Sequence, residues 1–253
     1  MSANGLWGDV RAYRAEIRRV RETFPNPRVD GWGLVRQFSR WRTMQQPGRT
    51  PLGDELPWIT LGGMEYLASI LRGTDRVFEW GSGGSTLYLS ARVKELVTVE
   101  HDQEWFERVR ERMREKNQTN WTGVLAEPEM VENSKSRSAE LWSDYFSSDD
   151  RFQESCFEKY AKRIEEYPDG AFNLVLVDGR ARPSCIHHAI PKVVSGGVLL
   201  LDNAERDYYA PACKAMIDAG WKLRDFQGPG PYIRYFWSTQ FWHKPESGGG
   251  GGC

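Results

Sequence analysis

The stretch VFEWGSGGST, from Val77 to Thr86, leads from an apolar strand into a glycine-rich turn. Glycine lets the backbone bend sharply and come close to a ligand, and the free N–H groups at the start of a following helix favour a polar or anionic group. Glu100 ends the next apolar run, nineteen residues after Gly81. An acidic residue at that distance is placed to accept hydrogen bonds from both hydroxyls of a ribose. The turn and the acid together predict a ligand that contains adenosine.

The same turn indicates which adenosine ligand is favoured. In the G-x-G-x-x-G pattern of dinucleotide-binding folds, Gly81 and Gly83 would be the first two glycines, but Thr86 stands at the third position. A nicotinamide cofactor is therefore disfavoured. Glu79 lies two residues before the first glycine, where its carboxylate could meet the positively charged end of a methionine moiety. The alternative is that Glu79 is tied to a neighbouring backbone N–H.

Short apolar runs alternate with longer amphipathic stretches from Leu61 onward, which is typical of β-α-β units and a mostly parallel sheet. Strands are predicted at 76–80, 96–100, 122–126, 172–177 and 197–201, followed by an antiparallel pair at 221–226 and 232–242. Helices are predicted at 63–71, 86–92, 103–115 and 210–219, with loop and helix over 127–170. The predicted fold class is α/β: a doubly wound, mostly parallel seven-stranded sheet with a C-terminal antiparallel strand pair and an N-terminal helical extension.

The N-terminal segment has a different pattern. Its apolar residues recur at spacings of four and three from Leu6 to Phe24, which predicts a helix with one apolar stripe. Ten arginines between Arg11 and Arg49 make this the basic region of the chain. We expect the stripe to pack on the main domain beneath a solvated arginine face, the alternative being a docking surface for an anionic partner or a membrane face. The predicted domains are an arginine-rich extension at 1–56, the main domain at 57–244 and a flexible glycine-rich tail at 245–253.

Four segments resemble the successive motifs of class I S-adenosylmethionine-dependent methyltransferases. They are EWGSGGST (79–86), VEHD (99–102), LVLVDGR (174–180) and GGVLLLDN (196–203), and the resemblance extends over about residues 57–244. It implies a Rossmann-like domain that binds S-adenosylmethionine, with Glu100 at the ribose and His101 near the adenine. The cofactor-binding residues predicted from the motifs are Glu79, Gly81, Ser82, Gly83, Ser85, Thr86, Glu100, His101 and Asp178.

Polar residues end two of the predicted strands. Asp178 follows the strand at 172–177, and Asp202 and Asn203 follow the strand at 197–201. Because neighbouring strands lie about 5 Å apart, these side chains can converge at one edge of the sheet and could hold Mg²⁺. The arrangement resembles metal-dependent catechol-type O-methyltransferases, but the lysine base of that group is replaced by Ala181. The alternative to a metal site at Asp178, Asp202 and Asn203 is that the aspartates orient loops or cofactor.

Methyl transfer from a sulfonium mainly requires a nucleophile held about 3 to 3.5 Å from the methyl carbon. A hydroxyl nucleophile also benefits from a proton acceptor at a strand end. The predicted catalytic residues are Asp178, His101 and Asp202, whereas His187 and His188 are expected to be surface or packing residues of a helix. Arg180 and Arg182 could orient an anionic substrate group. Aromatic residues that could close over a ring or sugar include Trp142, Tyr145, Tyr208, Tyr209 and Trp237.

The 34 basic and 35 acidic residues nearly cancel, so composition carries no strong nucleic-acid signal. No apolar run is long enough for a transmembrane segment or a signal peptide, and a cytoplasmic location is expected. The expected function is S-adenosylmethionine-dependent O-methylation of a small-molecule or saccharide substrate, and the N-terminal helix could form a homo-oligomer. One alternative is a non-catalytic adenosine-ligand-binding module that docks a partner through its basic segment. A NAD-dependent oxidoreductase is less favoured.

Overall fold

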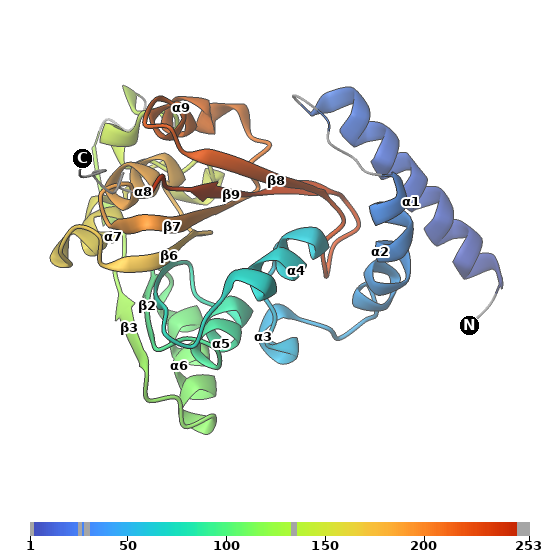
Figure 1. The fold of residues 1–253 in the computed structure, drawn as a ribbon, viewed down its shortest axis with the longest axis horizontal. Helices are drawn as coiled ribbons and strands as arrows, with labels where there is room; N and C mark the ends of the chain where they lie inside the picture. The colour runs from blue at the N-terminus through green and yellow to red at the C-terminus, as the bar shows by residue number, and fades with distance from the viewer. Residues whose placement is uncertain (1–2, 25–26, 28–30, 133–135, 247–253) are drawn as a thin grey trace, which may run out of the picture.

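A seven-stranded sheet forms the centre of the computed structural model, which describes residues 3–24, 27, 31–132 and 136–246 (Figure 1). The strands are β1 Arg76–Trp80, β2 Glu95–Glu100, β3 Trp121–Leu125, β6 Phe172–Val177, β7 Val193–Asp202, β8 Lys222–Gly228 and β9 Trp237–His243. Their order is β3-β2-β1-β6-β7-β9-β8. The first five strands in this order run parallel, whereas β9 is antiparallel to both β7 and β8. The predicted fold class is confirmed.

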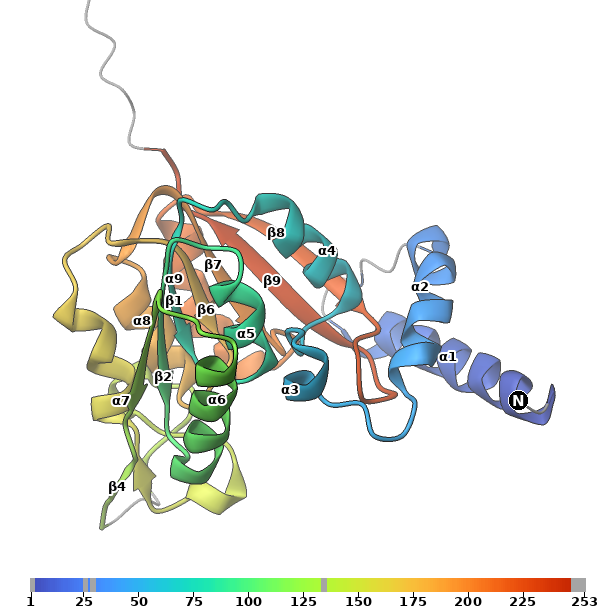
Figure 2. The same ribbon diagram turned by 90° about the horizontal axis from the view of Figure 1, so that it is seen from below.

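Helices cover both faces of the sheet (Figure 2). They are α1 Ala3–Thr23, α2 Gly31–Met44, α3 Pro51–Asp54, α4 Leu61–Ile70, α5 Gly84–Ser90, α6 Gln103–Glu115, α7 Glu158–Lys162, α8 Arg182–Ala189 and α9 Ala210–Asp218. Alternate residues of a strand point to opposite faces. Phe78 and Trp80 of β1 therefore join the hydrophobic cluster under α7 and α8, whereas Val77 joins the cluster under α4. Burial on both faces explains why the parallel strands are continuous apolar runs.

The structure contains elements that the sequence pattern does not predict. These are α2, α3 and a small antiparallel sheet of β4 Glu129–Met130 and β5 Ser155–Cys156. β7 begins at Val193 rather than at residue 197, and β9 begins at Trp237 rather than at residue 232. Pro229 and Pro231 lie between β8 and β9. Because proline cannot donate a ladder hydrogen bond, the chain leaves the sheet there and forms a loop.

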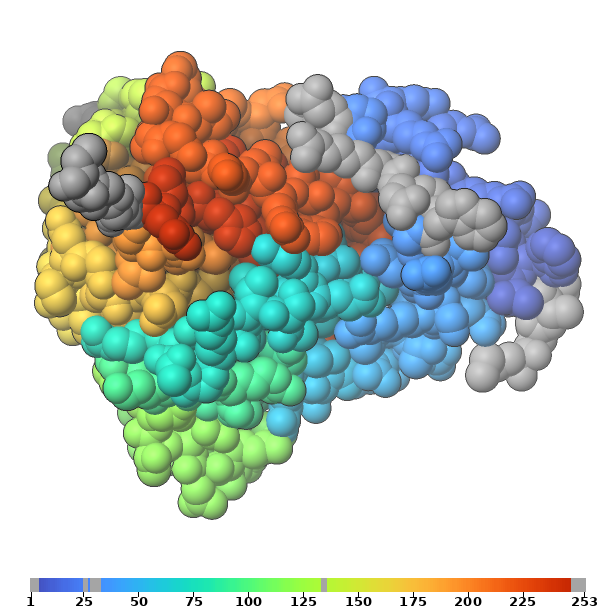
Figure 3. Space-filling model, viewed as in Figure 1, coloured from blue at the N-terminus to red at the C-terminus, as the bar shows by residue number. Residues whose placement is uncertain are grey.

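The N-terminal helices pack against the main body beside α4 and the β8–β9 pair (Figure 3). Tyr13 of α1 is buried, with its ring 4.9 to 5.1 Å from the rings of Phe38, Trp41 and Phe236. These aromatic residues belong to the same hydrophobic cluster as one face of the sheet. The predicted helix and its buried stripe agree with the structure, except that Leu6 at the start of the stripe is exposed.

Two further sequence expectations concern the ends of the chain and the membrane. Within the described ranges, no helix combines the length and apolar character that a bilayer span requires. The glycine-rich tail from residue 247 onward lies outside the described residues. The domain boundary at residue 56 stays a prediction.

Candidate active site

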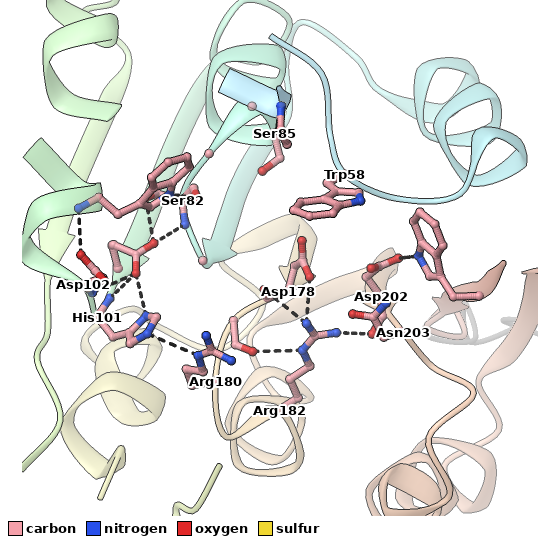
Figure 4. Close-up of a pocket in the computed structure, with 18 of the residues that line it drawn as sticks. Trp58, Ser82, Ser85, His101, Asp102, Asp178, Arg180, Arg182, Asp202 and Asn203 are labelled. Atoms are coloured by element: carbon pink, nitrogen blue, oxygen red, sulfur yellow. Dashed lines mark hydrogen bonds and ion pairs between the residues drawn. The ribbon is translucent and has the colours of Figure 1, made fainter. Parts of the chain in front are cut away.

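A cavity of about 580 Å³ opens at the carboxyl edge of the sheet, where ligands bind in α/β folds (Figure 4). Residues that end or follow β1, β2, β6 and β7 reach it from neighbouring strands. The predicted site residues that line it are Gly81, Ser82, Gly83, Ser85, Glu100, His101, Asp178, Asp202 and Asn203. Glu79 and Thr86 are not part of the cavity wall and are fully buried. The structure thus brings the sequence motifs together at one edge of the sheet.

The turn between β1 and α5 allows close approach to its backbone. Gly81 has a φ of +89°, and a β-carbon there would come 2.8 Å from the carbonyl oxygen of Asp178. Only glycine fits this position without strain. A β-carbon on Gly83, by contrast, would meet only Trp105, at 3.9 Å. The missing side chain at Gly83 therefore leaves open space at the cavity wall, which is not needed for folding.

Glu100 is a buried carboxylate with four hydrogen bonds. Its Oε2 accepts from the backbone N–H and the hydroxyl of Ser82, both at 2.8 Å, and its Oε1 accepts from the backbone N–H groups of His101 (2.7 Å) and Asp102 (3.0 Å). Burial by itself raises the pKa of Glu100, but the contacts with His101, Asp102 and Ser82 outweigh it and hold the pKa below its usual value. Glu100 is thus a fixed negative charge beside the turn.

Glu79 lies beneath the turn. Its Oε2 accepts hydrogen bonds from the hydroxyls of Thr86 (2.7 Å) and Thr98 (2.9 Å), and the Thr86 hydroxyl accepts one from the N–H of Gly83 (2.9 Å). Threonine at the third glycine position therefore ties the turn to Glu79. Burial raises the pKa of Glu79 to about 7. Its Oε1 has no hydrogen-bond partner in the part of the chain that the structure describes, which leaves one buried acceptor beside the turn.

His101 is held at both ring nitrogens. Its Nδ1 lies 2.7 Å from Oε1 of Glu100, and its Nε2 accepts a hydrogen bond from Nε of Arg180 at 3.3 Å. A ring nitrogen that faces a guanidinium is not available to take a proton from a substrate. The prediction of His101 as a catalytic base is therefore wrong on this geometry. Its side chain instead positions Glu100 and Arg180 at the cavity wall.

Arg182 is a buried guanidinium that joins the ends of β6 and β7 (Figure 4). It donates to the Asp178 carboxylate at 2.9 Å, to the carbonyl oxygen of Gly179 at 3.0 Å, and to the carbonyl oxygen of Asp202. These bonds use the donors of Arg182 inside the protein. The predicted role of Arg182 in orienting an anionic substrate group is thereby replaced by a role in holding the two strand ends together.

The carboxyl of Asp202 is also engaged by protein groups. Its Oδ1 accepts from the indole N–H of Trp237 (2.9 Å) and the hydroxyl of Thr239 (2.6 Å). Burial, reinforced by the charge of Asp178, raises the pKa of Asp202 well above its usual value and favours the neutral form. Burial also raises the pKa of Asp178, although Arg182 opposes this shift. Asp202 is therefore placed to position Trp237 and Thr239 rather than to exchange a proton with a substrate.

This arrangement does not fit the predicted magnesium site. Mg²⁺ prefers charged oxygen ligands, but Asp178 is paired with a guanidinium and Asp202 favours its neutral form. Asn203 has a φ of +48° and is the turn residue after β7. Over the described residues, no group of three or more His, Cys, Asp or Glu side chains is placed to hold a metal ion. The donor set of Asp178, Asp202 and Asn203 thus argues against a metal.

Several cavity residues are not among the predicted ones. They are Pro51, Trp58, Gly84, Asp102, Trp105, Arg151, Phe152, Gly179, Arg206, Ile233 and Tyr235. Figure 4 shows Trp58 across the cavity from Asp178. Trp58 comes from the linker before α4 and Arg206 from the loop after β7, and no periodic pattern marks such loop positions. Asp102 carries a recognisable signal, because it caps the predicted helix α6 by accepting from the N–H of Trp105 at 2.8 Å.

The aromatic residues expected to close over a substrate divide into two groups. Trp237 lines the main cavity, and Tyr208 and Tyr209 line a smaller cavity beside it. Trp142 instead stacks on His187, with ring centroids 3.5 Å apart, and Tyr145 stacks on His188. The packing role expected for the two histidines agrees with the structure, whereas Trp142 and Tyr145 are not part of either cavity.

Solved structures share this architecture. A candidate O-methyltransferase from Klebsiella pneumoniae is similar with a TM-score of 0.53 at 15% identity, over 93% of this chain and 99% of that chain. A candidate rRNA methylase from Clostridium thermocellum is similar with a TM-score of 0.52 at 11% identity, over 75% of this chain and 98% of that chain. No protein-family model and no curated protein sequence matches the chain. At these identities the likeness establishes the fold alone, which is the class I S-adenosylmethionine-dependent methyltransferase fold.

Proposed function

We propose that this protein is an S-adenosylmethionine-dependent methyltransferase that methylates an oxygen atom of a small molecule or saccharide. The observation that carries the proposal is the position of Glu100, a buried carboxylate with a lowered pKa that contacts Ser82 in the glycine turn. The cavity beside it extends without interruption to Asp178. A ligand bound at the turn therefore has a second, polar compartment in front of it for an acceptor.

The residues present fit this cofactor. Of the four donors around Glu100, only the Ser82 hydroxyl can rotate away, so a ribose hydroxyl can take its place. The unpartnered Oε1 of Glu79 is a suitable acceptor for the ammonium group of a methionine moiety. Thr86 keeps a nicotinamide cofactor disfavoured, because its hydroxyl fills the helix–strand contact where a third glycine would lie.

Asp178 is the residue that we assign to proton transfer. S-Adenosylmethionine, when bound, supplies a methyl group on a positively charged sulfonium. Oδ1 of Asp178 is held by Arg182, which leaves Oδ2 to take the proton of an acceptor hydroxyl as the hydroxyl oxygen attacks the methyl carbon. The raised pKa of Asp178 makes it a stronger base than an exposed aspartate. No step requires a metal ion.

The test is transfer of a labelled methyl group from S-adenosylmethionine to a panel of phenols and sugars, with excess chelator present. We expect Asp178→Asn to lower turnover about 100-fold or more while the cofactor affinity stays the same, because a positioned base contributes that much. Asp169→Asn, at an exposed aspartate, is the matched control. Failure of the protein to bind S-adenosylmethionine would overturn the proposal.

A second candidate is a non-catalytic adenosine-binding module that docks an anionic partner. The observation that favours it is the exposed arginine face of α1, formed by Arg11, Arg14, Arg18 and Arg21. Cofactor binding without transfer to any acceptor of the panel would support this module over the enzyme. A cytoplasmic location and a homo-oligomer formed through α1 are further proposals, and sedimentation velocity of the full chain tests the second.

A further inference from the structure

A smaller cavity of about 230 Å³ adjoins the main one. Its wall is formed by the start of α8, by the loop around Ser148 and Asp149, and by Tyr208 and Tyr209 after β7. The two cavities share four lining residues, which are Gly179, Arg180, Arg182 and Arg206. A molecule held in front of Asp178 can therefore place a substituent in this side cavity, by reaching past the shared arginines.

The charges around the side cavity are unequal. Three arginines line it, but Asp149 is the only carboxylate among its lining residues. Arg180 pairs with Asp149 at 2.8 Å, and Arg182 pairs with Asp178 at 2.9 Å. Arg206 has no carboxylate within ion-pair distance anywhere in the described ranges, so its positive charge has no partner in the protein there. The side cavity consequently carries excess positive charge.

Hydrogen-bond donors also gather in this place. Nη1 of Arg206 donates to the hydroxyls of Tyr208 and Tyr209, both at 3.2 Å, and the Tyr208 hydroxyl lies 2.7 Å from the hydroxyl of Ser148. Among the described residues, no partner is seen for Nε or Nη2 of Arg206. A planar guanidinium with these two nitrogens available matches the geometry of a carboxylate or phosphate group.

We propose that the side cavity binds an anionic group of the methyl acceptor, a carboxylate or a phosphate, with Arg206 as its main charged contact. This inference rests on the proposed function, because it assigns the acceptor of that reaction to the class of anionic small molecules or anionic saccharides. Arg206 is a specificity-determining residue: it selects acceptors by charge, while Asp178 at the other end of the molecule receives the proton. The Tyr208 hydroxyl supplies a neutral contact beside it.

The experiment is a calorimetric titration of the full chain, saturated with S-adenosylhomocysteine, with inorganic phosphate, glucuronate and glucose. We expect both anions to bind and glucose to bind at least tenfold more weakly than glucuronate, since it lacks the carboxylate. Arg206→Gln should weaken both anions about tenfold or more, and Arg206→Lys should restore most of the affinity. Arg224→Gln, which removes an exposed arginine stacked on Tyr66 far from the cavity residues, should bind like the parent.

Equal binding of glucose and glucuronate, or undiminished anion binding by Arg206→Gln, would overturn the inference. If Arg206→Gln does not fold, Tyr208→Phe replaces it, with a several-fold loss of anion affinity expected and no loss contradicting the inference. S-Adenosylmethionine is titrated separately into each protein. Cofactor binding with no anion binding leaves the proposed function in place and removes this inference, whereas anion binding without cofactor binding removes the proposed function.

Discussion

Glu79 combines full burial with one unpartnered oxygen and a pKa raised to about 7. Between its ordinary pKa and pH 7, the folded protein keeps a proton that the unfolded chain has lost, so the free energy of unfolding falls as the pH rises. We predict that Glu79→Gln removes this decrease, which amounts to about 3 kcal/mol at most. Urea unfolding of the parent and the variant at pH 5 and pH 8 measures it.

The control for this prediction is Glu104→Gln, because the Glu104 side chain is exposed on α6. It should leave the pH dependence of unfolding unchanged. The prediction fails if the parent and Glu79→Gln lose the same stability between the two pH values, since the proton on Glu79 would then be bound equally in both states.

At the scale of the element, the turn and the start of α5 separate folding from binding. A β-carbon on Gly84 would overlap the backbone carbonyl oxygens of Pro51 and Leu56, whereas one on Gly83 would meet open space. We predict that Gly84→Ala destabilises the fold by about 1 to 3 kcal/mol. Gly83→Ala should melt like the parent but bind S-adenosylmethionine more weakly, because the methyl group occupies space at the cavity wall.

Thermal melting and cofactor titration of the two variants check this contrast. Unchanged cofactor affinity in a folded Gly83→Ala protein would place the ligand away from the turn. Equal melting of Gly84→Ala and the parent would mean that α3 and the start of α5 can separate.

How well elements follow from the sequence depends on how they are buried. The predicted strands at 76–80 and 172–177 coincide with β1 and β6, because burial on both faces leaves an unbroken apolar run. The helix α2 also has a signal, since Leu34, Phe38 and Trp41 follow helical spacing, but its arginine-rich composition obscures it. β4 and β5 are two residues each, too short for any periodicity to show.

Side-chain directions at the site are less predictable than strand ends. Sequence position alone places Asp178 and Asp202 at one edge of the sheet. It does not place Arg182 between them, because that depends on Ala181, which has a φ of +45° and turns the chain at the start of α8. The magnesium prediction fails for this reason: a guanidinium lies where a cation would have to bind.

On the scale of the whole molecule, the N-terminal helices support the acceptor side of the cavity. Glu16 of α1 accepts from the backbone N–H of Phe236 at 2.8 Å, in the segment that carries the cavity residues Ile233 and Tyr235. The glycine turn and Glu100 make no such contact with α1. We predict that deleting residues 1–49 lowers the melting temperature and abolishes methyl transfer, while S-adenosylmethionine still binds.

Melting, cofactor titration and the methyl-transfer assay on the truncated and full chains test this division. Normal transfer by the truncated protein would show that α1 and α2 do not support the acceptor wall. Complete unfolding would show that the shared hydrophobic cluster makes these helices part of one indivisible core.

The central claim is that Glu100 holds the ribose of S-adenosylmethionine, and calorimetric titration of this cofactor into the parent, Glu100→Gln and Glu104→Gln tests it most directly. Replacing the charged acceptor by a neutral amide should weaken binding about tenfold or more, because a hydrogen bond to a charged group contributes about 1.5 to 3 kcal/mol. The Glu104→Gln control should bind like the parent. Parent-like affinity in a folded Glu100→Gln protein would contradict the account.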